Sequence, residues 1–151
     1  LEIGKKKVLA QNLTDRIKMQ LGDSEALHYE DNSFAAVTVA FGVRNFENLD
    51  KGLLEIFRVL KPKGTLVILE TAVPKNYFLK TFYMLYTQNI MPFIGKLFSK
   101  DRSAYKYLSD SAAVFPHGEV FNNILRKNGF IEVEDLPQTL GIASIYFAKK
   151  A

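Results

Sequence analysis

The pattern of apolar and polar residues predicts strands and helices that alternate along the chain. Residues 35–41 (AAVTVAF) and 65–70 (TLVILE) are mostly apolar runs, typical of strands covered on both faces of a parallel sheet. Between them, residues 49–60 carry apolar side chains at helical spacing, with Asn48 as a suitable N-cap and the turn sequence 61–64 (KPKG) as the stop. Strand, helix and strand with short links predict a βαβ unit with parallel strands and a right-handed crossover.

The C-terminal part of the sequence predicts a helix followed by a pair of strands. Residues 116–127 have helical spacing and end before Gly129, a residue type that favours helix C-termini. The expected inward side chains of this helix are Val120, Phe121, Ile124 and Leu125. Residues 130–136 alternate apolar with acidic side chains, and residues 141–149 form a final strand. The short link between these strands favours an antiparallel pair, which predicts a mostly parallel sheet with one reversed strand.

The N-terminal part predicts a helix and a short strand. Residues 1–11 have the character of a helix tail with a solvated lysine block, and residues 17–21 (IKMQL) alternate as in a strand. The sequence starts at Leu1 and enters the helix at once, so we expect a segment that is missing upstream.

An aromatic-rich segment, at about residues 74–115, separates the two halves. It holds about half of the chain's Phe and Tyr residues: Tyr77, Phe78, Phe82, Tyr83, Tyr86, Phe93, Phe98, Tyr105, Tyr107 and Phe115. Pro92 and Gly95 break it into short helices. An insertion of this length inside an α/β domain is usually functional, so we expect a helical lid inserted at about 74–115.

Composition narrows the class of protein. A chain of 151 residues buries one core, and no run of eighteen apolar residues offers a membrane-spanning helix. The absence of cysteine excludes disulfides and thiolate metal sites, and the two histidines lie far apart, so we expect no metal. The net charge of +4 is spread along the chain, which predicts no nucleic-acid partner. A cytoplasmic location fits these features.

Short strings along the whole chain match one known family. The most specific of them is residues 41–45 (FGVRN), at the end of the first apolar strand. Further matching strings are residues 22–27 (GDSEAL), 31–34 (DNSF), 58–62 (RVLKP), 69–70 (LE), 105–108 (YKYL), 115–116 (FP), 129–130 (GF) and 139–143 (TLGIA). On these strings the chain resembles the UbiE/MenG family of ubiquinone and menaquinone biosynthesis C-methyltransferases. The resemblance implies an α/β fold, the Rossmann-like class I S-adenosylmethionine (SAM)-dependent methyltransferase sheet. The family's glycine-rich loop and ribose-binding acid have no counterpart here, so we expect a single partial domain over residues 1–151 that lacks the first βαβ portion.

The resemblance also implies where SAM binds. Asp23 and Ser24 follow the predicted strand 17–21, at the carboxyl end where α/β sheets bind ligands, and would contact the adenine. Ala40, Phe41 and Gly42 end the next strand and would face the methionine and sulfonium part. From the residues alone, Gly22-Asp23-Ser24 is equally good turn chemistry, and Gly42 suits any loop that needs a small residue.

Arg44 and Asn45 are the expected catalytic residues. The implied reaction joins the SAM methyl group to a quinol ring carbon, which becomes nucleophilic when the neighbouring hydroxyl ionises. A guanidinium near that oxygen favours the phenolate and stabilises charge in the transition state. Arginine stays protonated in proteins and is a poor proton acceptor, so a water that it orients is the better base. The structural alternative is an Arg44 that pairs with Glu47 at a helix start.

The expected substrate is a polyprenylated quinol, bound by Tyr86, Tyr105 and Tyr107 of the aromatic segment. Basic residues of the same segment suit peripheral contact with an anionic inner-membrane surface. The alternative is that the aromatics fill a core and the lysines face water. An apolar strand 36–41 without its neighbour would form an unpaired edge, so a homodimer through that edge is a further expectation. Two other functions stay open: methylation of a different apolar acceptor, and a catalytically silent fragment that oligomerises.

Overall fold

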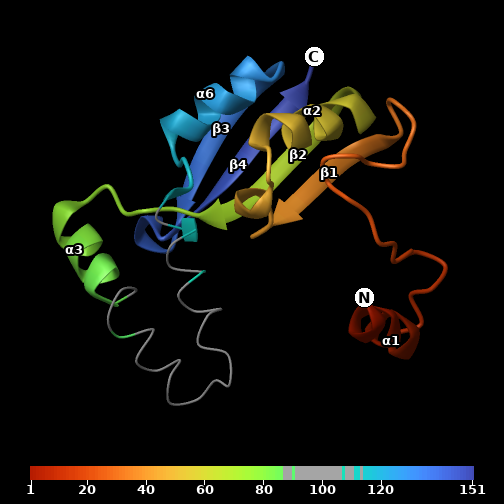
Figure 1. Cartoon of the computed structure of the whole chain (residues 1–151), viewed down its shortest axis with the longest axis horizontal. Coiled ribbons are helices and arrows are strands. Elements are labelled where there is room, and N and C mark those ends of the chain that lie inside the picture. Colours follow the sequence, from red (N-terminus) through yellow and green to blue (C-terminus); the bar gives the residue numbers. More distant parts are fainter. Residues whose placement is uncertain (87–89, 91–106, 108–110, 113) are drawn as a thin grey trace.

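The computed structural model describes residues 1–86, 90, 107, 111–112 and 114–151. Four strands, β1 (Phe34–Ala40), β2 (Leu60–Thr71), β3 (Phe130–Gln138) and β4 (Ala143–Lys150), form one sheet in the order β1-β2-β4-β3 (Figure 1). β1 and β2 are parallel, and β4 is antiparallel to both of its neighbours, β2 and β3. The predicted sheet, mostly parallel with one reversed strand, is therefore confirmed.

The βαβ unit forms as predicted, with a longer second strand. α2 (Leu49–Val59) begins after Asn48, whose side chain accepts a hydrogen bond from the Lys51 N–H at 3.0 Å. The expected turn at 61–64 is instead part of β2, where the pairing with β1 jumps from Phe34↔Leu60 to Ala36↔Thr65. A Cβ on Gly64 would lie 2.7 Å from the Lys61 carbonyl oxygen, so this bulge needs a residue without a side chain.

Two helices cover one face of the sheet. Alternate residues of β2 and β4 point to this face and are buried, as the period of two in a strand requires. They pack against α2 and α6 (Glu119–Lys127) in one cluster whose members include Leu53, Ile56, Leu66, Ile68, Phe121, Leu125, Tyr146 and Ala148. The opposite face of β2 and β4 is only half-buried. The expectation that β1 and β2 are covered on both faces is wrong for the part of the chain described, because α1 (Glu2–Ala10) buries no residue and lies apart from the sheet (Figure 1).

Two sequence predictions about single elements fail. Residues 17–21 are not a strand, and Leu21 is 87% exposed, because no described strand offers them a hydrogen-bonded neighbour. Val120 is 62% exposed, and Asn122 is buried in α6 with Phe121 and Leu125. Adjacent side chains project about 100° apart around a helix, so Val120 points outward while its neighbour Phe121 points into the core.

The remaining elements agree with the sequence. Gly129 ends α6 with a φ of 91°, and β3 and β4 are joined by the 3-10 turn Thr139–Gly141. α3 (Tyr77–Leu85) begins at Asn76, whose side chain accepts from the N–H groups of Phe78 and Leu79. Most of the segment expected as a lid lies outside the described residues, so the lid stays a prediction. Within the described ranges, no helix is long and apolar enough to cross a membrane.

Candidate active site

The candidate site lies at the carboxyl ends of β1 and β2. β1 ends at Ala40, and the chain then turns through Phe41, which has a positive φ of 52° and donates its N–H to the Leu69 carbonyl at 2.8 Å. Gly42 follows, and a Cβ there would lie 3.1 Å from the Val39 side chain. This turn leads directly into the 3-10 helix η1 (Val43–Asn45), so the predicted cofactor residues 40–42 lie next to the predicted catalytic residues Arg44 and Asn45.

Arg44 forms an ion pair with Glu70, the penultimate residue of β2. Its Nη1 lies 2.6 Å from Glu70 Oε1, and its backbone N–H donates to Oε2 at 3.3 Å. The Glu70 side chain is fully buried, and the Arg44 side chain is 10% exposed. The alternative that Arg44 pairs with Glu47 is therefore wrong. Glu70 is a site residue that the sequence analysis missed, although a single acid at the end of the buried run TLVILE was a signal for it.

Asn45 and Tyr107 are brought together, as two predicted site residues should be. The Tyr107 hydroxyl donates to Asn45 Oδ1 at 2.9 Å, and Asn45 Nδ2 lies 3.5 Å from the Phe41 carbonyl oxygen. Tyr86 is half-exposed at the C-cap of α3. Tyr105 lies outside the described residues. Thus, of the two expected substrate tyrosines that the structure describes, Tyr107 contacts a predicted catalytic residue.

The loop with Asp23 and Ser24 is a tight turn beside a pocket. Asp23 Oδ1 accepts from the Glu25 N–H at 2.9 Å, which is the hydrogen bond of an Asx turn. Ser24 lines a pocket of about 350 Å³. The other residues of its lining are Gln20, Leu21, Gly22, Leu27, His28 and Tyr29. A hydroxyl, an imidazole and an aromatic ring are groups that hydrogen-bond to and stack on a purine base.

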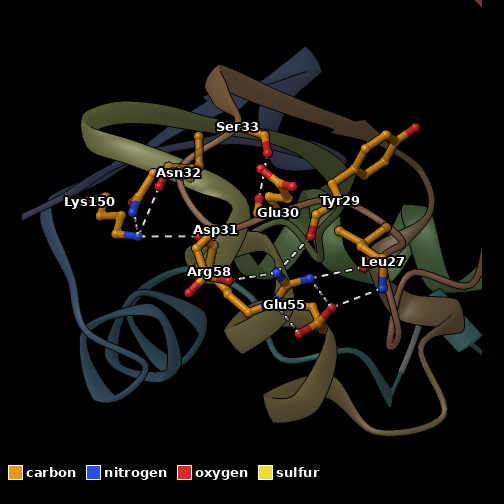
Figure 2. A network of polar contacts seen from close by, with 10 residues as sticks. Leu27, Tyr29, Glu30, Asp31, Asn32, Ser33, Glu55, Arg58 and Lys150 are labelled. Carbon is orange, nitrogen blue, oxygen red and sulfur yellow. Dashed lines mark hydrogen bonds and ion pairs between the residues drawn. The ribbon is translucent and has the colours of Figure 1, made fainter.

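Arg58 of α2 holds this loop in place. Its guanidinium donates to the carbonyl oxygens of Tyr29 at 2.7 Å and Leu27 at 2.9 Å, and to Asp31 Oδ1 at 2.8 Å (Figure 2). It also pairs with Glu55, whose Oε2 accepts from the Leu27 N–H at 2.9 Å. The hydrogen bond from Arg58 is the main reason that the pKa of Glu55 lies below its usual value. The sequence analysis did not identify this network.

The far end of the loop is tied to the sheet. Lys150 Nζ donates to Asn32 Oδ1 at 3.0 Å and to the Leu60 carbonyl at 2.9 Å (Figure 2). At the near end, Glu25 Oε1 accepts from the Asn48 N–H at 2.8 Å. The loop thus has anchors on α2, on the start of α2 and on β4. In the residues that the structure describes, no group of acidic and histidine side chains could hold a metal ion.

Comparison with known sequences gives one family. A model of the ubiE/COQ5 methyltransferase family matches residues 1–150. The demethylmenaquinone methyltransferase of Bacteroides fragilis is 44% identical over 150 residues, which cover 99% of this chain and 61% of that protein. The ubiquinone/menaquinone biosynthesis C-methyltransferase UbiE of Geotalea daltonii is 43% identical, with coverage of 99% and 63%. The chain therefore spans about three-fifths of the length of the curated relatives it matches.

Solved structures share the fold at low identity. A SAM-dependent methyltransferase from Aquifex aeolicus matches with a TM-score of 0.65 at 16% identity, over 97% of this chain and 61% of that one. A putative SAM-dependent methyltransferase from Methanococcus maripaludis matches with a TM-score of 0.61 at 20% identity, over 99% and 62%. The sheet and its helices are thus those of a class I SAM-dependent methyltransferase.

Proposed function

The chain belongs to the ubiE/COQ5 methyltransferase family, and on that premise we propose that it acts in SAM-dependent C-methylation of a polyprenylated quinol ring. The names of the two relatives, a demethylmenaquinone methyltransferase and a ubiquinone/menaquinone C-methyltransferase, support a quinone-type acceptor. The observation that carries the proposal is Arg44, held by Glu70 at the carboxyl ends of two parallel strands. This is the edge where open α/β sheets bind their ligands.

The residues present suit SAM. Ser24, His28 and Tyr29 line a pocket with the polar and aromatic groups that an adenine needs, and Asp23 fixes the turn beside it. Gly42, in the turn after Ala40 and Phe41, allows a ligand to approach the backbone closely. In this proposal Asp23, Ser24, Ala40, Phe41 and Gly42 are the cofactor residues. Bound SAM supplies an electrophilic methyl group on its sulfonium.

Arg44 activates the acceptor by hydrogen bonding. Its donors stabilise the phenolate form of the quinol, whose negative charge spreads to the ring carbon that is to be methylated. The hydroxyl proton leaves to water, since arginine does not accept it. As the ring carbon takes the methyl group, the methyl–sulfur bond breaks and its electron pair stays on sulfur. The ring carbon then gives up its own hydrogen as a proton to water as aromaticity returns. Because Glu70 balances the charge of Arg44, the contribution of Arg44 comes from directed N–H donors more than from net positive charge.

In this proposal the quinol binds at the strand ends beside Tyr107. Tyr107 touches Asn45, so a ring bound near Arg44 also meets a tyrosine hydroxyl. Tyr86 and Tyr105 complete the proposed substrate residues. The exposed rings of Tyr77, Phe78 and Phe82 on α3 suit the apolar tail, or peripheral contact with the membrane that holds it.

One observation favours a second candidate, the oligomerising fragment. β1 is an edge strand of the sheet, with several exposed residues, and such edges pair with other chains. Light scattering across a dilution series tests this candidate. A dimer that dissociates on dilution supports it, and a monomer at every concentration contradicts it.

Turnover tests the main proposal. The chain is incubated with SAM and a short-tailed demethylated naphthoquinol, and mass spectrometry follows the methylated product. Arg44→Met is the test variant and Arg16→Met, on the exposed N-terminal segment, is the matched control. We expect the turnover rate to fall by about 100-fold or more in Arg44→Met, as when one hydrogen-bond donor to a transition state is removed. We expect no change in the rate of the control. Equal turnover in both variants contradicts the role of Arg44. Calorimetry with SAM shows separately whether the chain binds the cofactor.

A further inference from the structure

Glu70 is a fully buried carboxylate whose contacts centre on Arg44. The alternation of β2 points Glu70 to the same face as the core residues Leu66 and Ile68. A buried charge is costly unless it is paired and hydrogen-bonded. Glu70 accepts from Arg44 Nη1 at 2.6 Å, from the Arg44 N–H at 3.3 Å and from the Thr71 N–H at 2.8 Å. A residue that only filled the core would be apolar, so its charge needs another explanation.

The two bonds to Arg44 fix that residue at both ends. The Oε2 bond holds the Arg44 backbone where η1 starts, and the Oε1 bond holds the tip of the side chain. Glu70 itself lies in β2, which pairs with β1 on one side and β4 on the other. A long and otherwise mobile arginine side chain is thus fastened to the central strand pair of the sheet. Such support is what holds a catalytic group in a productive geometry.

One buried donor of Arg44, its Nε, has no hydrogen-bond partner among the residues that the structure describes. A guanidinium donates through five N–H groups in a fixed plane, and Glu70 accepts a hydrogen bond from Nη1. A buried donor without a partner is destabilising, so an unpaired Nε is expected where a ligand oxygen or a water completes the site.

Arg44 also lines a pocket of about 240 Å³. The other residues of its lining are Val43, Phe46, Leu49, Ser111, Val114, Phe115 and Pro116. Most of these side chains are apolar, and among the described residues of the lining Arg44 is the only charged one. An apolar slot with a single fixed donor suits a flat aromatic ring that carries one oxygen substituent.

We propose that Glu70 is the positioning residue of the site, which holds Arg44 so that its Nε–H donates to the ring oxygen of the aromatic acceptor. The inference rests on the proposed function for the identity of that oxygen. Glu70 does not touch the acceptor and takes no proton. It orients the guanidinium and balances its charge, so that a directed hydrogen bond is left for the substrate.

A double-variant cycle separates positioning from mere stability. Glu70→Gln keeps the shape of the side chain but loses the charge, and we expect kcat to fall about 100-fold, as for a misplaced catalytic group, with the KM for SAM unchanged. Because Glu70 acts through Arg44, adding Glu70→Gln to Arg44→Met should lower kcat no further. Additive losses overturn the proposal, because they give Glu70 an effect independent of Arg44. Glu132→Gln, at an exposed acid that pairs with Lys149, is the matched control.

A second measurement needs no turnover. The ¹⁵N–¹H NMR signal of Arg44 Nε is assigned by its absence in Arg44→Met and followed while 1,4-naphthalenediol is added as the probe. We expect the signal to shift on addition in the wild-type chain and to shift less in Glu70→Gln at the same probe concentration. A signal that does not move, or that moves equally in both proteins, overturns the proposal. A chain that shows the shift but no methyl transfer keeps this inference and loses the proposed function.

Discussion

The hydroxyl of Tyr146 accepts a hydrogen bond from the backbone N–H of Gly118 at 2.9 Å. Tyr146 is fully buried in β4, and Gly118 is the N-cap of α6. Gly118 has no side chain that could cap the helix, so a distant strand residue satisfies its own N–H. This bond fixes the start of α6 above the sheet, where its side chains Phe121 and Leu125 enter the core.

The variant Tyr146→Phe should be less stable than the wild type. It leaves the Gly118 N–H without its partner, at a cost of about 1–3 kcal/mol in the free energy of unfolding. Urea denaturation at pH 7 measures this difference. Tyr77→Phe is the matched control, because Tyr77 is 78% exposed and its loss of a hydroxyl should change stability by less than about 0.5 kcal/mol. Equal losses of stability in the two variants would contradict a stabilising role for the Tyr146–Gly118 hydrogen bond.

The contribution of the Tyr146 hydroxyl to the free energy of unfolding should depend on pH. Burial, the largest cause, raises the pKa of its hydroxyl above the ordinary value of 10.0. The folded state therefore holds the proton more tightly than the unfolded state. This stabilisation is fully present below pH 10 and is lost as the pH rises through the folded pKa. We expect the difference in stability between wild type and Tyr146→Phe to shrink above pH 10. A difference that is constant from pH 7 to 11 would argue against a buried neutral hydroxyl.

The variant Gly52→Ala should destabilise α2 against the usual trend. Alanine in a helix interior is normally more favourable than glycine by about 1 kcal/mol. Here a Cβ at Gly52 would lie 2.3 Å from the ring of Phe46, and such overpacking costs about 1–3 kcal/mol. Gly4→Ala in α1 is the control, because its Cβ would meet only the end of the flexible Met19 side chain. Thermal denaturation should show a lower midpoint for Gly52→Ala and no decrease for Gly4→Ala.

The variant Arg58→Ala should loosen the loop that follows Ser24. It removes the donors to the Leu27 and Tyr29 carbonyls and frees Glu55, which accepts from the Leu27 N–H. Without these hydrogen bonds the loop opens more often, so the Leu27 amide should exchange its hydrogen at least about ten times faster. Hydrogen exchange followed by NMR measures this rate. Arg126→Ala, which breaks the exposed pair with Glu119, should leave the exchange of Leu27 unchanged. A Leu27 exchange rate in Arg58→Ala equal to that of the wild type would contradict the role of Arg58 in holding the loop.

Local sequence patterns determined most of the elements. The apolar periodicity of residues 49–60 and the Asn48 cap predicted α2, and the alternation in residues 130–136 with the short link to 141–149 predicted the antiparallel pair β3–β4. The string at residues 41–45 gave the position of Arg44 and Asn45 at the end of a strand. These features depend on contacts between near neighbours in the chain, so they are legible in the sequence.

Only the tertiary structure determined which distant residues form ion pairs and hydrogen bonds with one another. Glu70 is 26 residues from Arg44, and Arg58 is 31 residues from Leu27, so no local spacing links either pair. The predicted strand at 17–21 fails because it too depends on a distant partner. A strand exists only when another strand accepts its hydrogen bonds, and no described strand pairs with these residues. The sequence by itself determined which residue types are available to the proposed site. The pairing of the strands determined which carboxylate holds the arginine, because it brings the ends of β1 and β2 together.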